Sequence, residues 1–173
     1  MAWEIDTAHS EALFSVKHMM FSTVRGHFKV LSGSLNIDEE HPENSWVDAQ
    51  VDVTSVDTRD ERRDGHLRSP DFFDAEHYPT LTFKSSKVEK VGNNHFKVLG
   101  ELTMRGVTKP VVFDAEYHGQ GKNPYGMQIA GLSAKTKVNR KEWGLNWNAA
   151  LESGGVLVSE DVGIEIDLEA VQK

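Results

Sequence analysis

The sequence predicts a mainly β protein: a single antiparallel barrel of about eight strands with one or two short helices. Two observations lead to this prediction. Apolar and polar residues alternate along most of the chain, and short turn-like segments separate the alternating runs. The length of 173 residues, with 38% hydrophobic and 27% charged residues, is ordinary for one soluble domain. We therefore expect residues 1–173 to form one domain.

The predicted strands are runs in which alternate residues are apolar: 14–18, 31–37, 47–54, 81–85, 96–102, 111–117, 127–133 and 162–169. The run 47–54 has the clearest pattern, because valines and one alanine alternate with aspartates, glutamine and threonine. Such alternation places one face of a strand on a core and the other in water, as in antiparallel sheets. Closing the sheet removes its exposed edges, and about eight strands enclose room for one small ligand.

The segments between these runs have the composition of turns and loops. We expect turns at 41–44 and 92–94, a longer loop over 119–126, and a turn at 153–155 before the last strand. In the stretch 139–151, apolar and polar residues do not alternate. This stretch is either a loop at a strand edge or one helical turn followed by a strand.

One region has helical signals instead. Thr58-Arg59-Asp60-Glu61 is a capping box, which predicts a short helix from about Arg59 to Leu67. Ser69-Pro70-Asp71 offers a second helix start, with serine as the cap and proline at the first helical position. The apolar side of this region is Leu67, Phe72 and Phe73, so we expect it to cover one side or end of the barrel.

Composition excludes several classes of function. The chain has 19 Lys+Arg against 27 Asp+Glu, a net charge of −8, so it shows no basic footprint for nucleic acid. Without cysteine it has no disulfide, thiolate nucleophile, cysteine-based zinc site or iron–sulfur cluster. No apolar run approaches the ~18 residues of a membrane-spanning helix, so we expect no stable membrane insertion.

The N-terminal sequence bears on localisation. Met1-Ala2-Trp3-Glu4-Ile5-Asp6 lacks the basic segment and apolar run of a signal peptide. We therefore expect a cytoplasmic protein, although a mature exported chain with an added methionine would look the same.

The sequence contains eight histidines but no H-E-x-x-H pair, so we expect no metal site. His18 is in phase with Phe14 and Val16 and should point inward, either as a hydrogen-bonded core histidine or as a polar group facing a ligand. No G-x-S-x-G elbow or glycine-rich phosphate loop is present, and no carboxylate pair can be singled out. The enzyme alternative is therefore a reaction on a lipid-like substrate that uses His18 with a nearby carboxylate or a metal.

The segment 59–68 is dense in charge. It is either an exposed helix with ion pairs or a site for an anionic head group, and Arg63 and His66 stand close in sequence to Phe72-Phe73. The predicted inward faces are rich in aromatic side chains. Alternation alone leaves open whether they fill the barrel or leave an apolar cavity.

Five segments, taken together, resemble the YceI-like family. They are Trp3-x-Ile5-Asp6-x-x-His9-Ser10, the run Asp64-Gly65-His66-Leu67-Arg68-Ser69-x-Asp71-Phe72-Phe73-Asp74, Tyr78-Pro79-Thr80-Leu81-Thr82-Phe83, Gly100-Glu101-Leu102-Thr103-Met104-Arg105-Gly106, and Arg140-Lys141-Glu142-Trp143-Gly144-Leu145-x-Trp147. They occur in order over essentially the whole chain.

The resemblance implies an extended, lipocalin-like antiparallel barrel with an internal apolar tunnel. It implies non-enzymatic binding of a polyisoprenoid or similar long-chain amphipathic lipid, with no cofactor besides that ligand, and a homodimer. Met19-Met20-Phe21 would form an adaptable rim. The expected head-group residues are His18, Arg63 and His66. The expected lining is Phe14, Val16, His18, Phe28, Val30, Leu67, Phe72, Phe73, Leu81, Phe83, Phe96, Phe113, Trp143, Leu145 and Trp147.

Overall fold

The computed structural model describes residues 2–149, 151 and 157–173. Its strands are β1 (Trp3–Ile5), β2 (Glu11–His18), β3 (Ser22–Phe28), β4 (Leu31–Asn36), β5 (Trp46–Asp52), β6 (Val56–Asp57), β7 (Thr80–Gly92), β8 (His95–Met104), β9 (Val107–Lys122), β10 (Gln128–Asn139) and β11 (Asp161–Gln172). The helical elements are α1 (Glu61–Arg68) and the short 3-10 turns η1 (Thr7–His9), η2 (Pro42–Asn44), η3 (Val53–Ser55) and η4 (Arg140–Trp143).

The strands close into an antiparallel barrel. The sheet order is β1-β4-β5-β7-β8-β9-β10-β11, and β11 pairs back onto β1. Beyond this ring, β2 pairs with β11 and β3, and β3 pairs with β6. The pairs β1–β2, β3–β4 and β5–β6 thus act as interrupted single strands, which gives a closed eight-stranded meander. The predicted mainly β barrel is confirmed.

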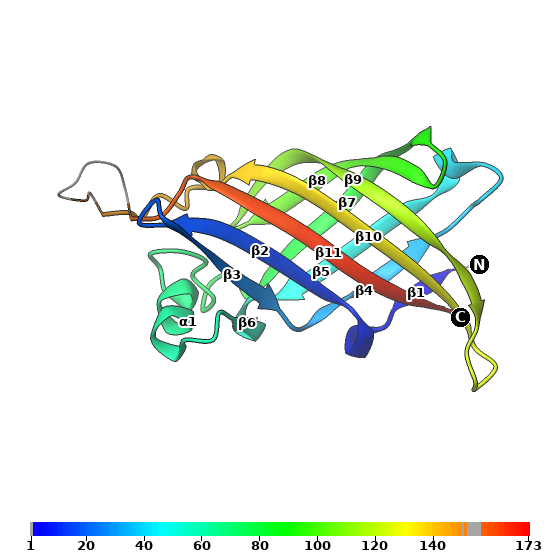
Figure 1. Cartoon of the computed structure of the whole chain (residues 1–173), viewed down its shortest axis with the longest axis horizontal. Coiled ribbons are helices and arrows are strands. Elements are labelled where there is room, and N and C mark those ends of the chain that lie inside the picture. Colours follow the sequence, from blue (N-terminus) through cyan, green and yellow to red (C-terminus); the bar gives the residue numbers. More distant parts are fainter. Residues whose placement is uncertain (1, 150, 152–156) are drawn as a thin grey trace.

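Figure 1 shows an elongated barrel with two different ends. We call the end that carries α1 and the β2–β3 turn the helical end. The other, the terminal end, carries both chain termini and the β9–β10 turn. The long segment between β6 and β7 contains α1 and returns the chain along the helical end.

The helix begins later than the capping box predicts. Asp60 is its N-cap, and the Asp60 carboxylate accepts hydrogen bonds from the backbone N–H groups of Arg62 and Arg63. Arg59 has a φ of 68°, which turns the chain between Thr58 and Asp60. Thr58 therefore lies beneath the helix, where its N–H and hydroxyl both donate to the Asp64 carboxylate.

The second predicted helix start at Ser69 was wrong, because residues 69–73 form bends and turns. The Ser69 carbonyl accepts the backbone N–H groups of both Phe72 and Asp74, which satisfies these donors without a helix. Asp74 is left-handed, with a φ of 52°. This compact turn brings Phe72 and Phe73 back against the barrel.

Most predicted connections are present. Residues 93–94 form the β7–β8 turn, and Asn94 supplies the left-handed conformation that hairpin turns need. The loop at 119–126 is shorter than expected, because β9 continues to Lys122. Its turn is held by the Asn123 side chain, which accepts the N–H groups of Tyr125 and Met127.

The stretch 139–151 begins with one 3-10 turn, η4, and residues 144–149 then follow without a strand. The predicted turn at 153–155 lies outside the residues that the structure describes.

Candidate functional site

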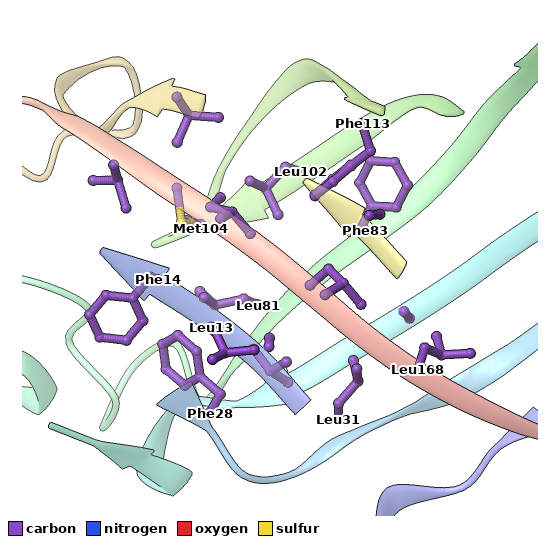
Figure 2. A pocket seen from close by; sticks show the side chains of 18 of the residues that line it. Leu13, Phe14, Phe28, Leu31, Leu81, Phe83, Leu102, Met104, Phe113 and Leu168 are labelled. Carbon is purple, nitrogen blue, oxygen red and sulfur yellow. The ribbon is translucent and has the colours of Figure 1, made fainter. Parts of the chain in front are cut away.

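A cavity of about 630 Å³ occupies the interior of the barrel. Its wall is almost entirely apolar and takes side chains from every long strand. Figure 2 shows side chains from four strands converging on it: Leu31 of β4, Leu81 and Phe83 of β7, Leu102 of β8 and Phe113 of β9. The volume lies in the range of small-molecule sites in proteins.

The two-residue period of the strands builds this wall. On β11, Val162, Ile164, Ile166 and Leu168 all line the cavity, while the residues between them face outward or towards neighbouring strands. The cavity follows β11 from Val162 to Leu168, a rise of about 20 Å. Several inward apolar side chains of the wall, including those of Phe83 and Ile166, are only half-buried although they point into the barrel. The interior is therefore a tunnel rather than a filled core.

Most of the lining residues that the resemblance implies lie on the cavity wall: Phe14, Val16, His18, Phe28, Leu67, Phe72, Phe73, Leu81, Phe83, Phe96, Phe113, Leu145 and Trp147. Val30 does not. It sits between β3 and β4, where the strand is interrupted and the alternation loses its phase, and its side chain is 38% exposed. Trp143 is also absent from the wall. It is 1% exposed, and its indole N–H donates to the Leu102 carbonyl at 2.9 Å, as a core tryptophan.

Sequence reasoning missed several wall residues. Val88 lines the cavity because the β7–β8 register shifts between Ser85 and Lys87, which changes the inward phase of β7. Nothing in the sequence marks that shift. The four residues of β11 were missed for another reason: their alternation is visible in the sequence, but the resemblance did not assign them to the lining.

Aromatic rings form the wall near the helical end. Phe28 packs against Phe14 and Phe73, with ring centroids 5.5 and 5.6 Å apart. Trp147 packs against Phe72 at 5.4 Å and edge-on against His66 at 4.6 Å. The turn after α1 is thus joined through these rings to β2, β3 and the segment after η4.

Charged and polar side chains gather at the same end. Arg63 lies on the cavity wall, and its guanidinium donates to the Thr58 hydroxyl at 2.7 Å and to the Thr58 carbonyl at 2.6 Å. Asp64 is 4% exposed and is held by the N–H and hydroxyl of the same threonine. Arg68, by contrast, pairs with Glu61 at 3.2 Å on the surface. The charged segment therefore combines a surface ion pair with a cation fixed at the cavity.

Arg140, which sequence reasoning did not single out as a site residue, is a second cation on the wall. It is 4% exposed and donates to the backbone carbonyls of Leu145, Val158 and Ser159. Burial lowers the pKa of Arg140, because the charged form loses solvation. All three hydrogen bonds go to uncharged carbonyl groups. None of them brings a negative charge to the guanidinium.

The histidines on the wall differ in their partners. His66 Nε2 lies 2.8 Å from an Asp71 carboxylate oxygen, whereas the structure describes no ring hydrogen bond for His18. His18 forms a backbone bridge with Val158 beside Arg140. The three expected head-group residues, His18, Arg63 and His66, therefore lie on the wall toward the helical end with Arg140.

The terminal end carries a separate polar contact. The Tyr117 hydroxyl on β9 donates to Glu39, in the β4–β5 connection, at 2.5 Å, and Gln120 donates to the same oxygen at 2.9 Å. Burial, and then this hydrogen bond, raise the pKa of Tyr117 to about 12. The hydrogen bond from Tyr117 lowers the pKa of Glu39. The contact joins two sides of the barrel at this end of the tunnel.

No helix in the described part of the chain is long and apolar enough to cross a membrane. Among the described residues, Asp6, His9 and Glu169 place potential metal-ligand atoms within 4.8 Å of one another. None of the three lines the cavity.

The fold and the site define a class: a closed up-and-down antiparallel barrel around an apolar cavity, the architecture that lipocalins also have. Within this class, the chain belongs to the YceI-like family, whose domain model matches residues 3–170. It is similar to a UPF0312 protein of Vibrio cholerae serotype O1, with 39% identity over 98% of this chain and 86% of that protein. A UPF0312 protein of Staphylococcus epidermidis is 37% identical over 96% of this chain and 95% of that protein.

Solved structures show the same fold. BcnA of Burkholderia cenocepacia is similar with a TM-score of 0.82 and 25% identity, covering 95% of this chain and 98% of that one. A YCEI protein of Campylobacter jejuni has a TM-score of 0.78 and 34% identity, covering 91% and 90%. A polyisoprenoid binding domain from Saccharophagus degradans has a TM-score of 0.77 at 16% identity, covering 99% and 98%, which is a likeness of fold alone.

Proposed function

We propose that this protein binds a polyisoprenoid or a similar long-chain amphipathic lipid in its tunnel, without catalysis, for transport, storage or sequestration. The observation that carries the proposal is the hollow interior, in which apolar side chains from all sides remain only half-buried. Exposing such a surface to water is unfavourable, and an apolar chain would cover it. A structural neighbour described as a polyisoprenoid binding domain supports this choice of ligand.

The energetics fit a chain-like ligand. Each buried methylene contributes roughly 0.8 kcal/mol, so ten methylenes would supply about 8 kcal/mol before the cost of ordering the ligand. Few polar contacts are then needed for tight binding. We place the tail along β11 and the polar head toward the helical end, where Arg63, His66 and Arg140 line the cavity.

Two further expectations belong to this proposal. We propose a cytoplasmic location, and a homodimer as the resemblance implies. Native mass spectrometry of the freshly purified protein would give the oligomeric state together with any bound lipid, and fractionation of the producing cells would give the location.

A blocked tunnel tests the binding proposal. Ala134 on β10 lies in the wall opposite Ala115 on β9, so Ala134→Trp would place an indole in the tunnel. We expect the wild-type protein to yield a stoichiometric long-chain lipid on organic extraction, and Ala134→Trp to yield little or none. Val112→Trp is the matched control, because Val112 is 44% exposed on the outer face of β9. Equal lipid content in the two variants, or no lipid bound by the wild type even after lipid is added back, would overturn the proposal.

A further inference from the structure

The tip of the β2–β3 hairpin exposes three large apolar side chains in a row. Met19, Met20 and Phe21 are 43%, 61% and 85% exposed. Single exposed apolar residues are common, but a contiguous group at the end of a projecting hairpin is a feature of interaction sites. Figure 1 shows this hairpin at the helical end, between α1 and the segment that precedes β11.

Met19 and Met20 are unusual residues for the backbone conformation of the tip. Met19 and Met20 have φ values of 52° and 65°, and the Phe21 N–H donates to the His18 carbonyl at 3.2 Å. Consecutive left-handed residues in a hairpin turn favour Asn and Gly. A residue with a long side chain loses roughly 1–2 kcal/mol in this conformation. Turn stability therefore does not explain the two methionines, and their exposed side chains suggest a role outside the fold.

The tip is fixed beside the tunnel. The Met19 N–H donates to the Leu157 carbonyl at 2.7 Å, and the backbones of Lys17 and Ser159 are joined at 3.0 Å. Leu157, Val158, Val16 and His18 all line the cavity. The apolar tip is thus continuous with the helical end of the tunnel wall.

The charge of the segment that carries the tip differs from that of the whole chain. The net charge is −8, yet no aspartate or glutamate occurs from Ala12 to Ile37. Near the tip, Lys17 and Arg25 are exposed. Among the residues that the structure describes, neither forms an ion pair, and the Lys17 ammonium donates only to the Thr23 hydroxyl. Cations flanking exposed apolar side chains are the combination that binds an anionic membrane surface.

We propose that the tip Met19–Phe21 docks on the surface of an anionic lipid bilayer and presents the helical end of the tunnel to it. The three apolar side chains enter the interfacial region, while Lys17 and Arg25 face the anionic head groups. The purpose of docking rests on the proposed function, since a lipid that passes directly between bilayer and tunnel avoids water. The docking itself is testable without any lipid in the tunnel.

Vesicle binding tests the proposal. The wild-type protein should co-sediment with phosphatidylglycerol/phosphatidylcholine vesicles, bind much less to pure phosphatidylcholine, and lose binding as salt rises. Met19→Asn/Met20→Gly/Phe21→Ser should weaken binding by about tenfold or more. This variant has the residues that the turn favours, so it should unfold at the same or a higher temperature. Tyr125→Ser is the matched control: Tyr125 is also 85% exposed but lies in the β9–β10 turn at the opposite end.

Lys17→Gln/Arg25→Gln should weaken binding to anionic vesicles only, with Lys122→Gln at the terminal end as its control.

No binding by the wild type, equal binding to neutral vesicles, or unchanged binding of the tip variant would overturn docking. Ala134→Trp separates this result from the proposed function, because it should still bind vesicles while carrying no lipid. If the wild-type protein contains lipid but does not bind vesicles, only the docking proposal is overturned. If it binds vesicles but never contains lipid, only the proposed carrier function is overturned.

Discussion

Two buried charges at the helical end are held by uncharged partners. The Asp64 carboxylate accepts the N–H and hydroxyl of Thr58, and Arg140 donates to three carbonyls. Burying a charge is costly unless its hydrogen bonds are satisfied. Both residues tie down the segments that carry wall residues: Asp64 binds α1 to Thr58, and Arg140 binds Leu145, Val158 and Ser159. Their role is to position the wall.

Histidine–aspartate pairs make stability depend on pH. His9 lies 2.8 Å from Asp6 and His77 lies 2.9 Å from Asp74. These hydrogen bonds raise the pKa of both histidines above 6.5 and lower the pKa of Asp6 below 3.8. The histidine contributions are complete below pH 6.5 and disappear as the pH rises through the higher folded-state pKa. The Asp6 contribution is complete above pH 3.8 and disappears as the pH falls.

We therefore expect these pairs to stabilise the protein most between about pH 4 and 6.5. From pH 6 to pH 8, the melting temperature of the double variant His9→Gln/His77→Gln should fall less than that of the wild type. The two falls should differ by no more than about 4 °C, because the pairs are exposed. Melting temperatures by circular dichroism at the two pH values measure this. His95→Gln, exposed at the β7–β8 turn, is the control, and an identical pH dependence of wild type and double variant would refute the assignment.

At the scale of elements, the barrel depends on interrupted strands. Chain breaks at η1, at residues 29–30 and at η3 divide three strands. Both halves of the first, β1 and β2, pair with β11, but on their other side β1 pairs with β4 and β2 with β3. The interruptions let β3 turn into β4 and let β6 pair with β3 while β5 pairs with β4. They also place Val30 outside the wall.

Gly33 tests the close approach of β4 and β5. It has a φ of 136°, and a Cβ at this position would lie 2.2 Å from the Asp48 carbonyl oxygen of β5. Because neither the backbone conformation nor the space suits a side chain, we expect Gly33→Ala to lower the free energy of unfolding by about 2 kcal/mol or more. Gly121→Ala, in a strand with open space around it, should change it little. Urea unfolding measures both, and equal values for the two variants would contradict the packing described for β4.

At the scale of the whole molecule, the barrel encloses a volume that its own side chains do not fill. Some residues that face inward pack fully, such as Trp3 and Leu35, which are 2% and 3% exposed. Between the two ends, Phe83, Leu132 and Ile166 keep accessible surface. A ligand that covers them would add to stability, because it binds only the folded state.

We expect removal of the bound lipid to lower the melting temperature. With ligand at about 100 times its Kd, binding adds about 2.7 kcal/mol, which corresponds to roughly 5–10 °C for a domain of this size. Scanning calorimetry before and after mild delipidation, and again after lipid is added back, measures the change. Ala134→Trp should show no such shift, and an unchanged melting temperature in the wild type would argue against a tunnel ligand.

The sequence alone determined the inner faces of the strands without a register shift or a break, and the class of fold. Side chains alternate strictly along a strand, so the runs at 47–54 and 162–169 identified their inner faces without a structure. The resemblance carried by segments such as 64–74 and 100–106 pointed to the family and, through Phe72 and Phe83, to residues now seen on the wall.

Only the tertiary structure decided the phase of interrupted strands, the role of single residues and the state of the interior. A chain break keeps Val30 off the wall, a register shift turns Val88 onto it, and a hydrogen bond to the Leu102 carbonyl holds Trp143 in the core. None of these features is visible as a pattern in the local sequence. Arg140 reaches the cavity because distant carbonyls hold it there. Whether the interior is hollow depends on the summed volume of side chains that meet across the barrel, and that sum exists only once the strands have closed.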